Sequence, residues 1–514
     1  MTESSLKANR AKNVRNGILA GAVNNVLCFV LPFVSRTIII YVFGSAYLGL
    51  NGLFNSLINV LNISELGFGA ALSYLLYKPI AENDKDKVCA ILAFGRKAFH
   101  IIGLVVLGLG LSLIPFLDNL ISSDRPPEIN IVILFLLYLV NSVVSYFTFS
   151  YKRILFSASQ RYDIETTIAS GTLIFQYIFQ IVLLLTTHNY YLFVAMTIVA
   201  SIANNILCQT VTRRLYPEYE RRGKISSQDK GIVLKTLKGV FLSKLGSVIF
   251  LAAGNIIISC IFGLNTLGIY TNYYYVITML LSFFAIMHNS LRPTLGNCIL
   301  TDSKDTIYER LINLTHMYTW LSTVAACGML CLYQEFVYLW AGQDFLLPQV
   351  FVFLFTGLFY VDRLCCIPSI FVEASGLWYE SRLIYLLAAS IVIVGGFVLS
   401  KLLGLSGVPL AYMASSAFAC VVGYVIVLFK HFFEDKKREY SYFLFLFRNV
   451  ALQVMSMALI LWASSYFKAD TIPLFLVKGL LVTVMSVLCY MVLGRIDKQS
   501  YRYAWQLCRS LIKR

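Results

Sequence analysis

The sequence predicts an all-α polytopic membrane protein with about 14 transmembrane helices, arranged as two six-helix lobes around a central cavity with two extra C-terminal helices. Three observations support this class. Of the 514 residues, 58% are hydrophobic and 13% are charged, which is about half the charged share of a soluble domain. Apolar runs of spanning length recur along the chain. A short glycine motif also recurs at an offset of 219 residues.

The composition excludes several classes of protein. A mean hydropathy of +0.74 excludes a soluble enzyme and a disordered chain, and no polar stretch is long enough to fold as a large extramembrane domain. The 12 cysteines lie mostly in apolar segments without a CxxC pair, so we interpret them as small apolar side chains of membrane helices. The five histidines lie in different segments, so no metal site is expected.

Hydrophobic runs between charged or Pro/Gly-containing breaks predict the individual helices. The first run follows a short basic segment and has about 26 residues, which is too long for a signal-peptide core, so we expect an uncleaved first span. The predicted spans are 17–42, 48–80, 88–114, 129–150, 164–186, 190–211, 240–262, 268–292, 310–332, 348–372, 382–400, 408–430, 441–466 and 472–493.

The basic residues predict the orientation of the chain. With the N-terminus placed in the cytoplasm, about 32 of the 42 Lys and Arg residues fall in cytoplasmic segments, and only Arg125, Lys401 and Lys468 fall on the opposite side. This asymmetry predicts that both termini are cytoplasmic. It also accounts for most of the net charge of +16, so membrane lipids are expected as partners and nucleic acid is not.

The same spans suggest a division of the chain. We expect an N-lobe over 1–212, a cytoplasmic linker over 213–239, a C-lobe over 240–430, accessory spans over 431–493 and a basic amphipathic tail over 494–514. One helical face of that tail is apolar and the other is basic, which favours an interfacial helix on the anionic inner leaflet, although a solvated tail is the alternative. The apolar face comprises Tyr501, Ala504, Trp505, Cys508, Leu511 and Ile512.

The repeated motif is FGxxxLG. It covers Phe43 to Gly49 and again Phe262 to Gly268, and in both copies it lies between two long apolar runs. Two copies with the same orientation imply two halves related by an axis along the membrane normal, whereas chance similarity between apolar segments is the alternative.

The offset also pairs polar residues of the two halves. Asn25 and Arg36 share one helical face of the first span, and adding 219 to their positions gives Lys244 and Asn255. Each half therefore carries a cation and an amide on one face, in exchanged order. Such faces would suit opposite walls of a central cavity.

Span 48–80 carries a polar face. Asn51, Asn55, Asn59 and Asn62 lie within an arc of about 80°, and Glu65 extends it. These groups are costly in contact with lipid, so they form either hydrogen bonds between helices or a cavity wall that binds a hydroxyl-rich ligand. The offset takes Asn51 and Asn55 to Tyr270 and Tyr274, which are also polar-tipped. Gly67 and Gly69 favour a bend in this span.

Charged residues at membrane depth are candidates for binding and coupling. Arg36, Lys244 and Arg363 are candidate cations for a diphosphate, although an ion pair between Arg36 and Glu65 is an alternative role for Arg36. Glu65 and Asp362 are candidates for coupling to an ion. Asp362 and Arg363 point about 100° apart on a helix, so they need not pair with each other. His100, His288 and His316 are weaker candidates as proton carriers.

Catalytic motifs are missing from the sequence. There is no GxxxxGK[ST] sequence, no Ser/His/Asp pattern and no zinc spacing. The chain is therefore expected to be a transporter and not an enzyme, without ATP hydrolysis of its own. No cofactor is expected apart from a coupling ion, H⁺ or Na⁺.

Residues of the first hundred positions resemble a known family. The segments Ser35-Arg36-Thr37-Ile38-Ile39, Phe43-Gly44, Tyr47-Leu48-Gly49-Leu50, Glu65-Leu66-Gly67-Phe68-Gly69 and Tyr77-Lys78-Pro79-Ile80-Ala81 resemble bacterial polysaccharide repeat-unit flippases of the Wzx type. These flippases belong to the multidrug/oligosaccharidyl-lipid/polysaccharide exporter superfamily. The rest of the chain agrees in span count and lobe boundary.

The resemblance implies a function. Such a protein flips undecaprenyl-diphosphate-linked oligosaccharide repeat units from the inner to the outer leaflet of the bacterial cytoplasmic membrane by alternating access, for capsule, exopolysaccharide or O-antigen assembly. A polysaccharide polymerase machinery would be its partner. A cation-coupled drug antiporter of the same superfamily is the alternative, and it would favour acidic residues in the cavity. A membrane-embedded polymerase or acyltransferase would need a catalytic outer loop, which the sequence lacks.

Overall fold

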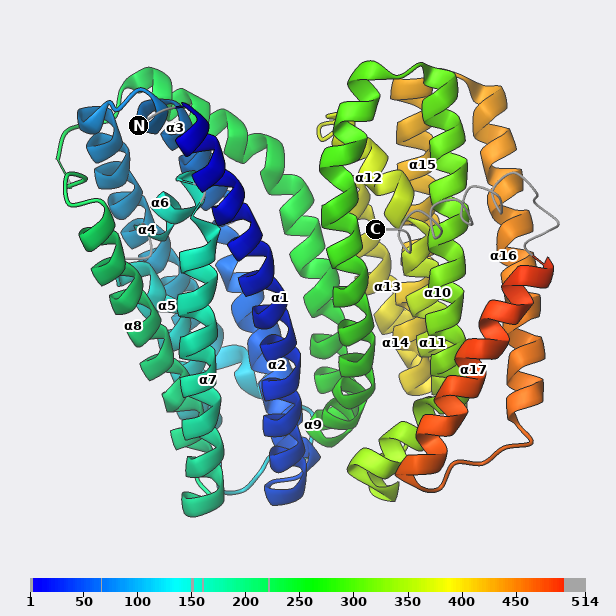
Figure 1. The fold of residues 1–514 in the computed structure, drawn as a ribbon. Helices are drawn as coiled ribbons and strands as arrows, with labels where there is room; N and C mark the ends of the chain where they lie inside the picture. Colours follow the sequence, from blue (N-terminus) through cyan, green and yellow to red (C-terminus); the bar gives the residue numbers. More distant parts are fainter. Residues whose placement is uncertain (1–2, 66, 149–151, 160, 221, 494–514) are drawn as a thin grey trace. The chain divides into compact units, whose positions relative to one another are not determined.

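A computed structural model describes residues 3–493 of the chain, apart from 66, 149–151, 160 and 221. Helices account for nearly all of this described part, and it contains no β-strand, so the all-α class is confirmed (Figure 1). The chain forms two compact units, Met1–Gly268 and Ile269–Arg514. We call them unit 1 and unit 2.

Unit 1 contains eight helices and the first part of a ninth within the described residues. Side chains just before several helices define where they begin, since Asp84, Asn130 and Asn189 each accept a hydrogen bond from a backbone N–H in the first turn. The helices are α1 (Glu3–Val42), α2 (Ser45–Leu61), α3 (Phe68–Ala81), α4 (Lys85–Leu113), α5 (Ile131–Phe147), α6 (Arg153–Ala158), α7 (Tyr162–Thr187), α8 (Tyr190–Leu215) and α9 (Ser227–Thr301).

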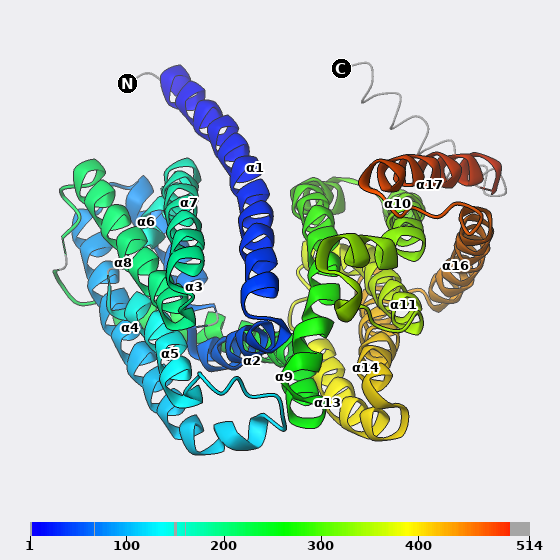
Figure 2. The ribbon, with the colours of Figure 1, turned by 90° about the horizontal axis from the view of Figure 1, so that it is seen from below.

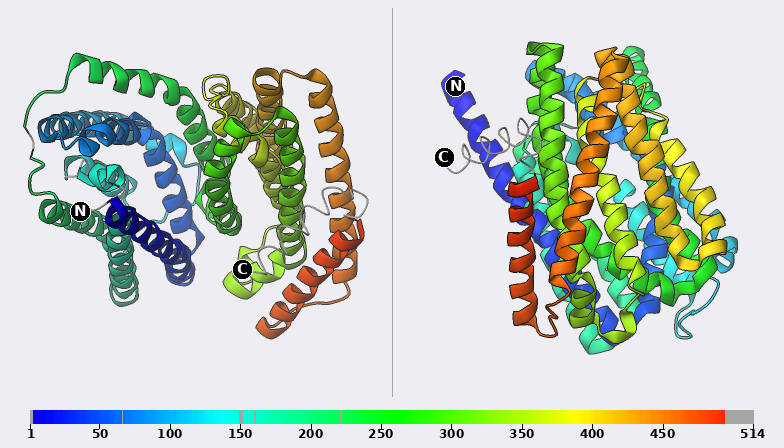
Figure 3. Two further views of the ribbon diagram at one scale, coloured as in Figure 1. Left: turned by 45° about the horizontal axis from the view of Figure 1, so that its top comes forward. Right: turned by 90° about the vertical axis from the view of Figure 1, so that its right-hand side faces the viewer.

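Unit 2 begins inside α9 and ends with two accessory helices, which lie side by side in Figure 3. Its further helices are α10 (Lys304–Ala341), α11 (Val350–Leu364), α12 (Cys366–Ala374), α13 (Ile384–Leu403), α14 (Gly407–Ser415), α15 (Val422–Leu428), α16 (Lys436–Ser464) and α17 (Ile472–Leu493). A π-helical turn, Ser416–Val421, joins α14 to α15, and a second one, Phe429–Phe433, extends α15.

Every predicted span corresponds to a helical segment of the described chain. Helix α9 bends at Gly263, where φ is 83°, and it supplies two spans. The pairs α2–α3, α11–α12 and α14–α15 supply one each. Among the described residues, ten continuous helical stretches are long and apolar enough to cross a membrane, so the chain is a multi-pass membrane protein.

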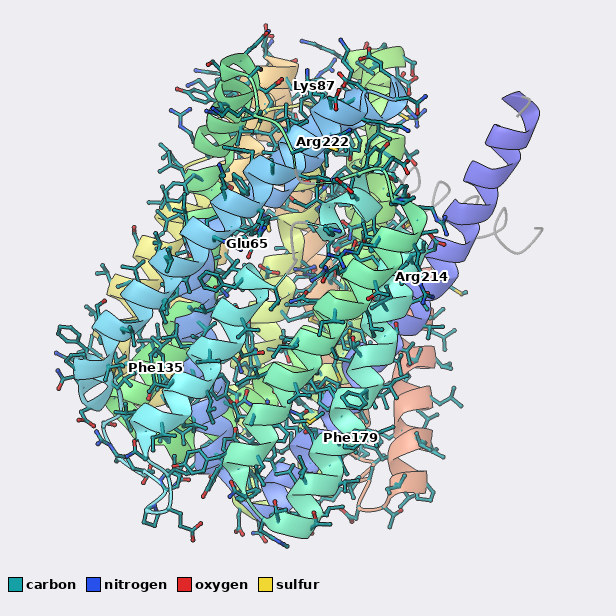
Figure 4. The ribbon with its side chains drawn as sticks, turned by 90° about the vertical axis from the view of Figure 1, so that its left-hand side faces the viewer. Glu65, Lys87, Phe135, Phe179, Arg214 and Arg222 are labelled. Atoms are coloured by element: carbon teal, nitrogen blue, oxygen red, sulfur yellow. The ribbon has the colours of Figure 1, made fainter. Side chains whose placement is uncertain are left out.

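The exposed and buried faces of the helices agree with this conclusion. Helix α7 exposes a row of large apolar side chains, including Phe179 and Leu185, as a lipid-facing helix would. In contrast, the interior of unit 1 holds Phe54, whose ring centroid lies 5.5 Å from those of Phe135 and Tyr138. Figure 4 labels Phe135 and Phe179 on this unit.

The helices extend into the segment predicted as a linker, 213–239. Helix α8 continues to Leu215 and α9 begins at Ser227, so among the described residues of this segment only those of 216–220 and 222–226 lie outside helices. The cause is an N-terminal cap, because the Ser226 hydroxyl accepts a hydrogen bond from the Asp229 N–H at 3.1 Å. The boundary between the two compact units follows Gly268, so residues 240–268, which were predicted to begin the C-lobe, belong to unit 1. The division into two functional lobes stays a prediction.

The repeated glycines mark a close helix crossing inside unit 1. A Cβ atom on Gly49 would overlap the backbone carbonyl of Leu264, and a Cβ atom on Gly268 would overlap that of Ser45. Because Ser45 and Leu264 are themselves 219 residues apart, the two contacts are reciprocal. The Ser45 hydroxyl also donates to the Asn265 side-chain oxygen at 2.8 Å. Figure 2 shows α2 alongside α9, and only glycine allows this approach.

Candidate functional site

A cavity of about 640 Å³ lies between α2, the turn that follows it and α9, entirely inside unit 1. Its polar lining contains an amide pair, a carboxylate and one ammonium group. The lining residues are Ser56, Asn59, Asn62, Glu65, Gly67, Gly69, Lys244, Val248, Leu251 and Ala252. A membrane helix bundle that presents such groups to a cavity can hydrogen-bond a polar ligand and attract an anion.

The local sequence explains how the polar groups reach the cavity. Helix α2 ends at Leu61, and a 3₁₀ turn over Asn62–Glu65 follows it. Gly67 then adopts a left-handed conformation, with φ of 87° and ψ of −10°, which a glycine adopts without strain. The predicted bend in this span is therefore confirmed at Gly67. Figure 4 labels Glu65 midway along the unit.

Asn62 and Glu65 are joined to α5 by hydrogen bonds. The Asn62 side-chain oxygen accepts from the Ser142 hydroxyl at 2.7 Å and lies 3.0 Å from the Tyr146 hydroxyl. The Tyr146 hydroxyl also lies 2.7 Å from Glu65 Oε2. A tyrosine has one hydroxyl hydrogen, so Asn62 and Glu65 compete for it. These contacts hold the cavity wall against α5.

The other asparagines divide into two kinds. Asn51 and Asn255 form interhelical contacts, because Asn51 Nδ2 lies 3.5 Å from the Tyr190 hydroxyl and Asn255 Nδ2 donates to Ser56 Oγ at 2.9 Å. In contrast, Asn55 and Asn25 are exposed, and Asn55 Nδ2 donates to Asn51 Oδ1 at 2.6 Å. The polar face of α2 therefore serves both packing and the cavity.

The three candidate cations have different surroundings. Lys244 lines the cavity. Arg36 is half-buried on α1 and does not line this cavity. Arg363 lies in unit 2, where its guanidinium donates to Asp362 and lies 5.8 Å from the ring centroid of Phe284. Only Lys244 therefore shares a described cavity with the predicted amides.

Arg363 and Asp362 pair with each other, although their positions on a helix did not require it. Helix α11 ends at Leu364, and the long arginine side chain folds back to its neighbour at this helix end. The pair is half-buried, with 14% and 28% of the two side chains exposed. The Asp362 carboxylate therefore already neutralises the positive charge of Arg363, which was expected to face a phosphate.

Tyr270 and Tyr274 lie in unit 2, where their rings are nearly parallel, with centroids 6.4 Å apart. Tyr270 is only 3% exposed and its ring packs 5.1 Å from that of Phe355. Its ring is therefore a packing element of the unit interior, while Tyr274 is half-buried.

Sequence reasoning missed a second polar cavity of about 550 Å³ in unit 1, which shares Glu65 and Gly69 with the first. It contains Arg153 and Glu165, whose charged groups are 3.0 Å apart. The short helix α6 places Arg153 there, and its six residues are too few to produce a periodic signal.

Another cluster in unit 2 was also missed. Arg292 and Glu373 form an ion pair, and His288 Nε2 lies 3.5 Å from the same carboxylate. Of this cluster, sequence reasoning singled out only His288, as a weaker candidate proton carrier. Among the described residues no group of three or more His, Cys, Asp or Glu side chains could hold a metal ion.

No family model matches the sequence, and no curated protein matches it. Solved structures do match it. One is the lipid II flippase MurJ in an inward closed conformation, with a TM-score of 0.61 and 12% identity over 94% of this chain and 99% of that one. The chain has the fold of the MurJ and MATE transporters.

Two MATE structures illustrate the second group of matches. An inward-facing multidrug resistance MATE family transporter of the MOP superfamily matches with a TM-score of 0.60 and 14% identity, over 80% of this chain and 98% of that one. A mutant of the Vibrio cholerae MATE transporter VcmN matches with a TM-score of 0.55 and 14% identity, over 83% of this chain and 98% of that one. At these identities the likeness concerns the fold.

Proposed function

We propose that this protein is a flippase that moves undecaprenyl-diphosphate-linked oligosaccharide repeat units from the inner to the outer leaflet of the bacterial cytoplasmic membrane, as the Wzx-type resemblance implies. The observation that carries the proposal is the unit 1 cavity, in which Lys244 faces the same space as Asn59 and Asn62. An ammonium group suits a phosphate, and amides supply both donors and acceptors for sugar hydroxyls.

The fold comparisons support a lipid substrate over a drug. The flippase match covers 94% of this chain, while the two MATE matches cover 80% and 83%. Helices α16 and α17 extend from residue 436 to 493, and their combined length is of the size of this difference. The ammonium group of Lys244 in the cavity also supports an anionic lipid-linked substrate, because a cation antiporter would favour acidic side chains.

The physical mechanism follows from the charge of the cargo. The oligosaccharide and diphosphate would enter the polar cavity while the prenyl chain stays in the lipid. Lys244 offsets part of the cost of removing the diphosphate from water. Moving two negative charges outward across about 100 mV, inside negative, is favourable by roughly 4–5 kcal/mol. Alternating access would then expose the site to the two sides in turn.

The test is depletion of the protein followed by extraction of membrane lipids. We expect prenyl-diphosphate oligosaccharide to accumulate in the inner leaflet. Complementation with Lys244→Ala combined with Asn59→Ala should fail, while Lys401→Ala, which removes an exposed lysine at the end of α13, should restore transport. Normal transport by the double variant at normal protein levels would contradict the assignment of the cavity.

The drug antiporter remains the second candidate, and Glu65 is the observation that favours it. This carboxylate lines the cavity and would suit a cationic drug or a coupling proton. Unchanged lipid intermediates in depleted cells, together with altered drug tolerance that depends on Glu65, would establish that function in place of the flippase.

A further inference from the structure

A separate basic pocket lies in unit 1, away from the proposed cargo cavity. Its volume is about 590 Å³, and none of its lining residues belongs to the cargo cavity. Three of them are cations from three parts of the fold, one is a carboxylate and two are tyrosines. The lining residues are Arg96, Lys152, Arg213, Tyr216, Pro217, Tyr219 and Glu220.

The loop that forms one side of this pocket is anchored to α4. Arg222 Nη2 of this loop lies 3.3 Å from Asp86 Oδ1 of α4, and just after the loop Asp229 Oδ2, in the first turn of α9, lies 3.6 Å from Lys87 Nζ of α4. Gly223 packs against Ala90. Figure 4 labels Lys87 and Arg222 near the same end of the unit. The pocket is therefore built by a docked segment.

Two of the pocket cations, Arg96 and Arg213, differ from the basic residues around them. Arg153 and Arg161 each lie within 3.1 Å of a carboxylate oxygen, in Glu165 and Asp163. Arg96 and Arg213 are exposed to the pocket and have no ion pair in the described part of the chain. Lys152 is 6% exposed. Arg96 and Arg213 carry two positive charges against the single carboxylate of Glu220, so these two residues alone leave an excess of positive charge for a ligand to neutralise.

The tyrosines add hydrogen-bond donors. The rings of Tyr216 and Tyr219 are stacked, with centroids 5.8 Å apart and planes 16° apart. Burial raises the pKa of the Tyr219 hydroxyl, and the nearby Glu218 carboxylate raises it further. This hydroxyl therefore keeps its proton and can donate to an anionic oxygen.

We propose that this pocket binds a phosphate group, carried either by an anionic phospholipid headgroup or by a soluble phosphate ester. Basic pockets between membrane helices on the cytoplasmic side bind phosphate headgroups of this kind. The charge distribution predicts that this end of unit 1 faces the cytoplasm. Exposed apolar side chains such as Ile206 and Leu207 on α8 offer a surface for acyl chains of a lipid.

The experiment uses full-length purified protein and two matched variants. Arg96→Gln combined with Arg213→Gln removes two pocket cations, whereas Arg214→Gln removes the exposed neighbour that does not line the pocket. Native mass spectrometry counts bound phosphatidylglycerol. We expect the double variant to bind it roughly tenfold more weakly, and Arg214→Gln to bind it as wild type does. Equal binding by all three proteins would overturn the lipid form of the proposal.

Thermal unfolding of the wild-type protein identifies the source of the phosphate and does not depend on the variants folding. Stabilisation by phosphatidylglycerol but not by phosphatidylcholine or glycerol 3-phosphate supports a lipid headgroup. Stabilisation by glycerol 3-phosphate, lost in the double variant, supports a soluble ester. If neither phosphate compound raises the unfolding temperature more than phosphatidylcholine does, the site does not bind phosphate.

Discussion

Gly44 and Gly263 adopt the same backbone conformation although 219 residues separate them. The φ and ψ angles are 85° and −174° at Gly44, and 83° and 178° at Gly263. This region is essentially restricted to glycine. Each residue therefore ends one long helix and begins the next with the same change of direction, which makes the sequence repeat a structural one.

Alanine at these two positions should separate strain from crowding. At Gly44 a Cβ atom meets nothing within 4 Å, so Gly44→Ala should cost about 1–3 kcal/mol from backbone strain alone. At Gly263 a Cβ atom would also overlap Ser123, so Gly263→Ala should lower the unfolding temperature in detergent further. Gly171→Ala, in the open interior of α7, is the control and should not destabilise. Equal stability of all three variants would refute the role of these turns.

The reciprocal glycines at the crossing of α2 and α9 predict non-additive effects. Gly49→Ala and Gly268→Ala each place a Cβ atom on a backbone carbonyl, which cannot rotate away. Each should destabilise by roughly 1–3 kcal/mol. The double variant should cost less than the sum, because one separation of the helices relieves both overlaps. If the loss of stability in the double variant equals the sum of the losses in the two single variants, the two contacts are independent.

Asn59 and Asn62 provide a test that distinguishes packing from binding. Asn62 accepts hydrogen bonds from α5, so Asn62→Ala should cost about 1 kcal/mol of stability. No hydrogen bond of the Asn59 side chain occurs among the described residues, yet it lines the cavity. Asn59→Ala should therefore keep wild-type stability while transport falls. A loss of stability without a loss of transport at Asn59 would assign it to packing.

The ion pair of Lys478 and Glu335 holds accessory helix α17 against α10. Lys478 Nζ lies 2.6 Å from Glu335 Oε1, with 8% and 23% of the side chains exposed. Lys478→Met should destabilise by about 1–3 kcal/mol, because the partly buried Glu335 carboxylate loses its charged partner. Adding Glu335→Gln should recover much of that loss. Lys468→Met, at an exposed position, is the control, and an equal loss there would show that the pairing is unimportant.

Hydropathy was enough to predict the helices, because a spanning helix must be apolar along its whole length. The bend near Gly67 was also predictable, since two closely spaced glycines interrupt a long polar-faced span. The helical start at Ser227 was not, because a charged segment that begins a helix with a local cap resembles a linker in composition.

Contacts between helices were mostly beyond sequence reasoning. The ion pair of Arg292 with Glu373 depends on packing between elements 81 residues apart, for which a single sequence carries no signal. The pairing of Arg363 with Asp362 depends on the fold-back of a long side chain at a helix end. Of the predicted cavity residues, Asn59, Asn62, Glu65 and Lys244 meet in one cavity.

The number of helices between the two turn glycines has an evolutionary consequence. From Gly44 to Gly263 the described chain has six passages of spanning character, made by α2–α3, α4, α5, α7, α8 and the first part of α9. An even number of crossings returns the chain to its starting side. A tandem gene duplication of such a unit would insert its second copy in the same orientation as the first. The basic residues that set the membrane orientation of the ancestral unit would then have set the same orientation for both copies.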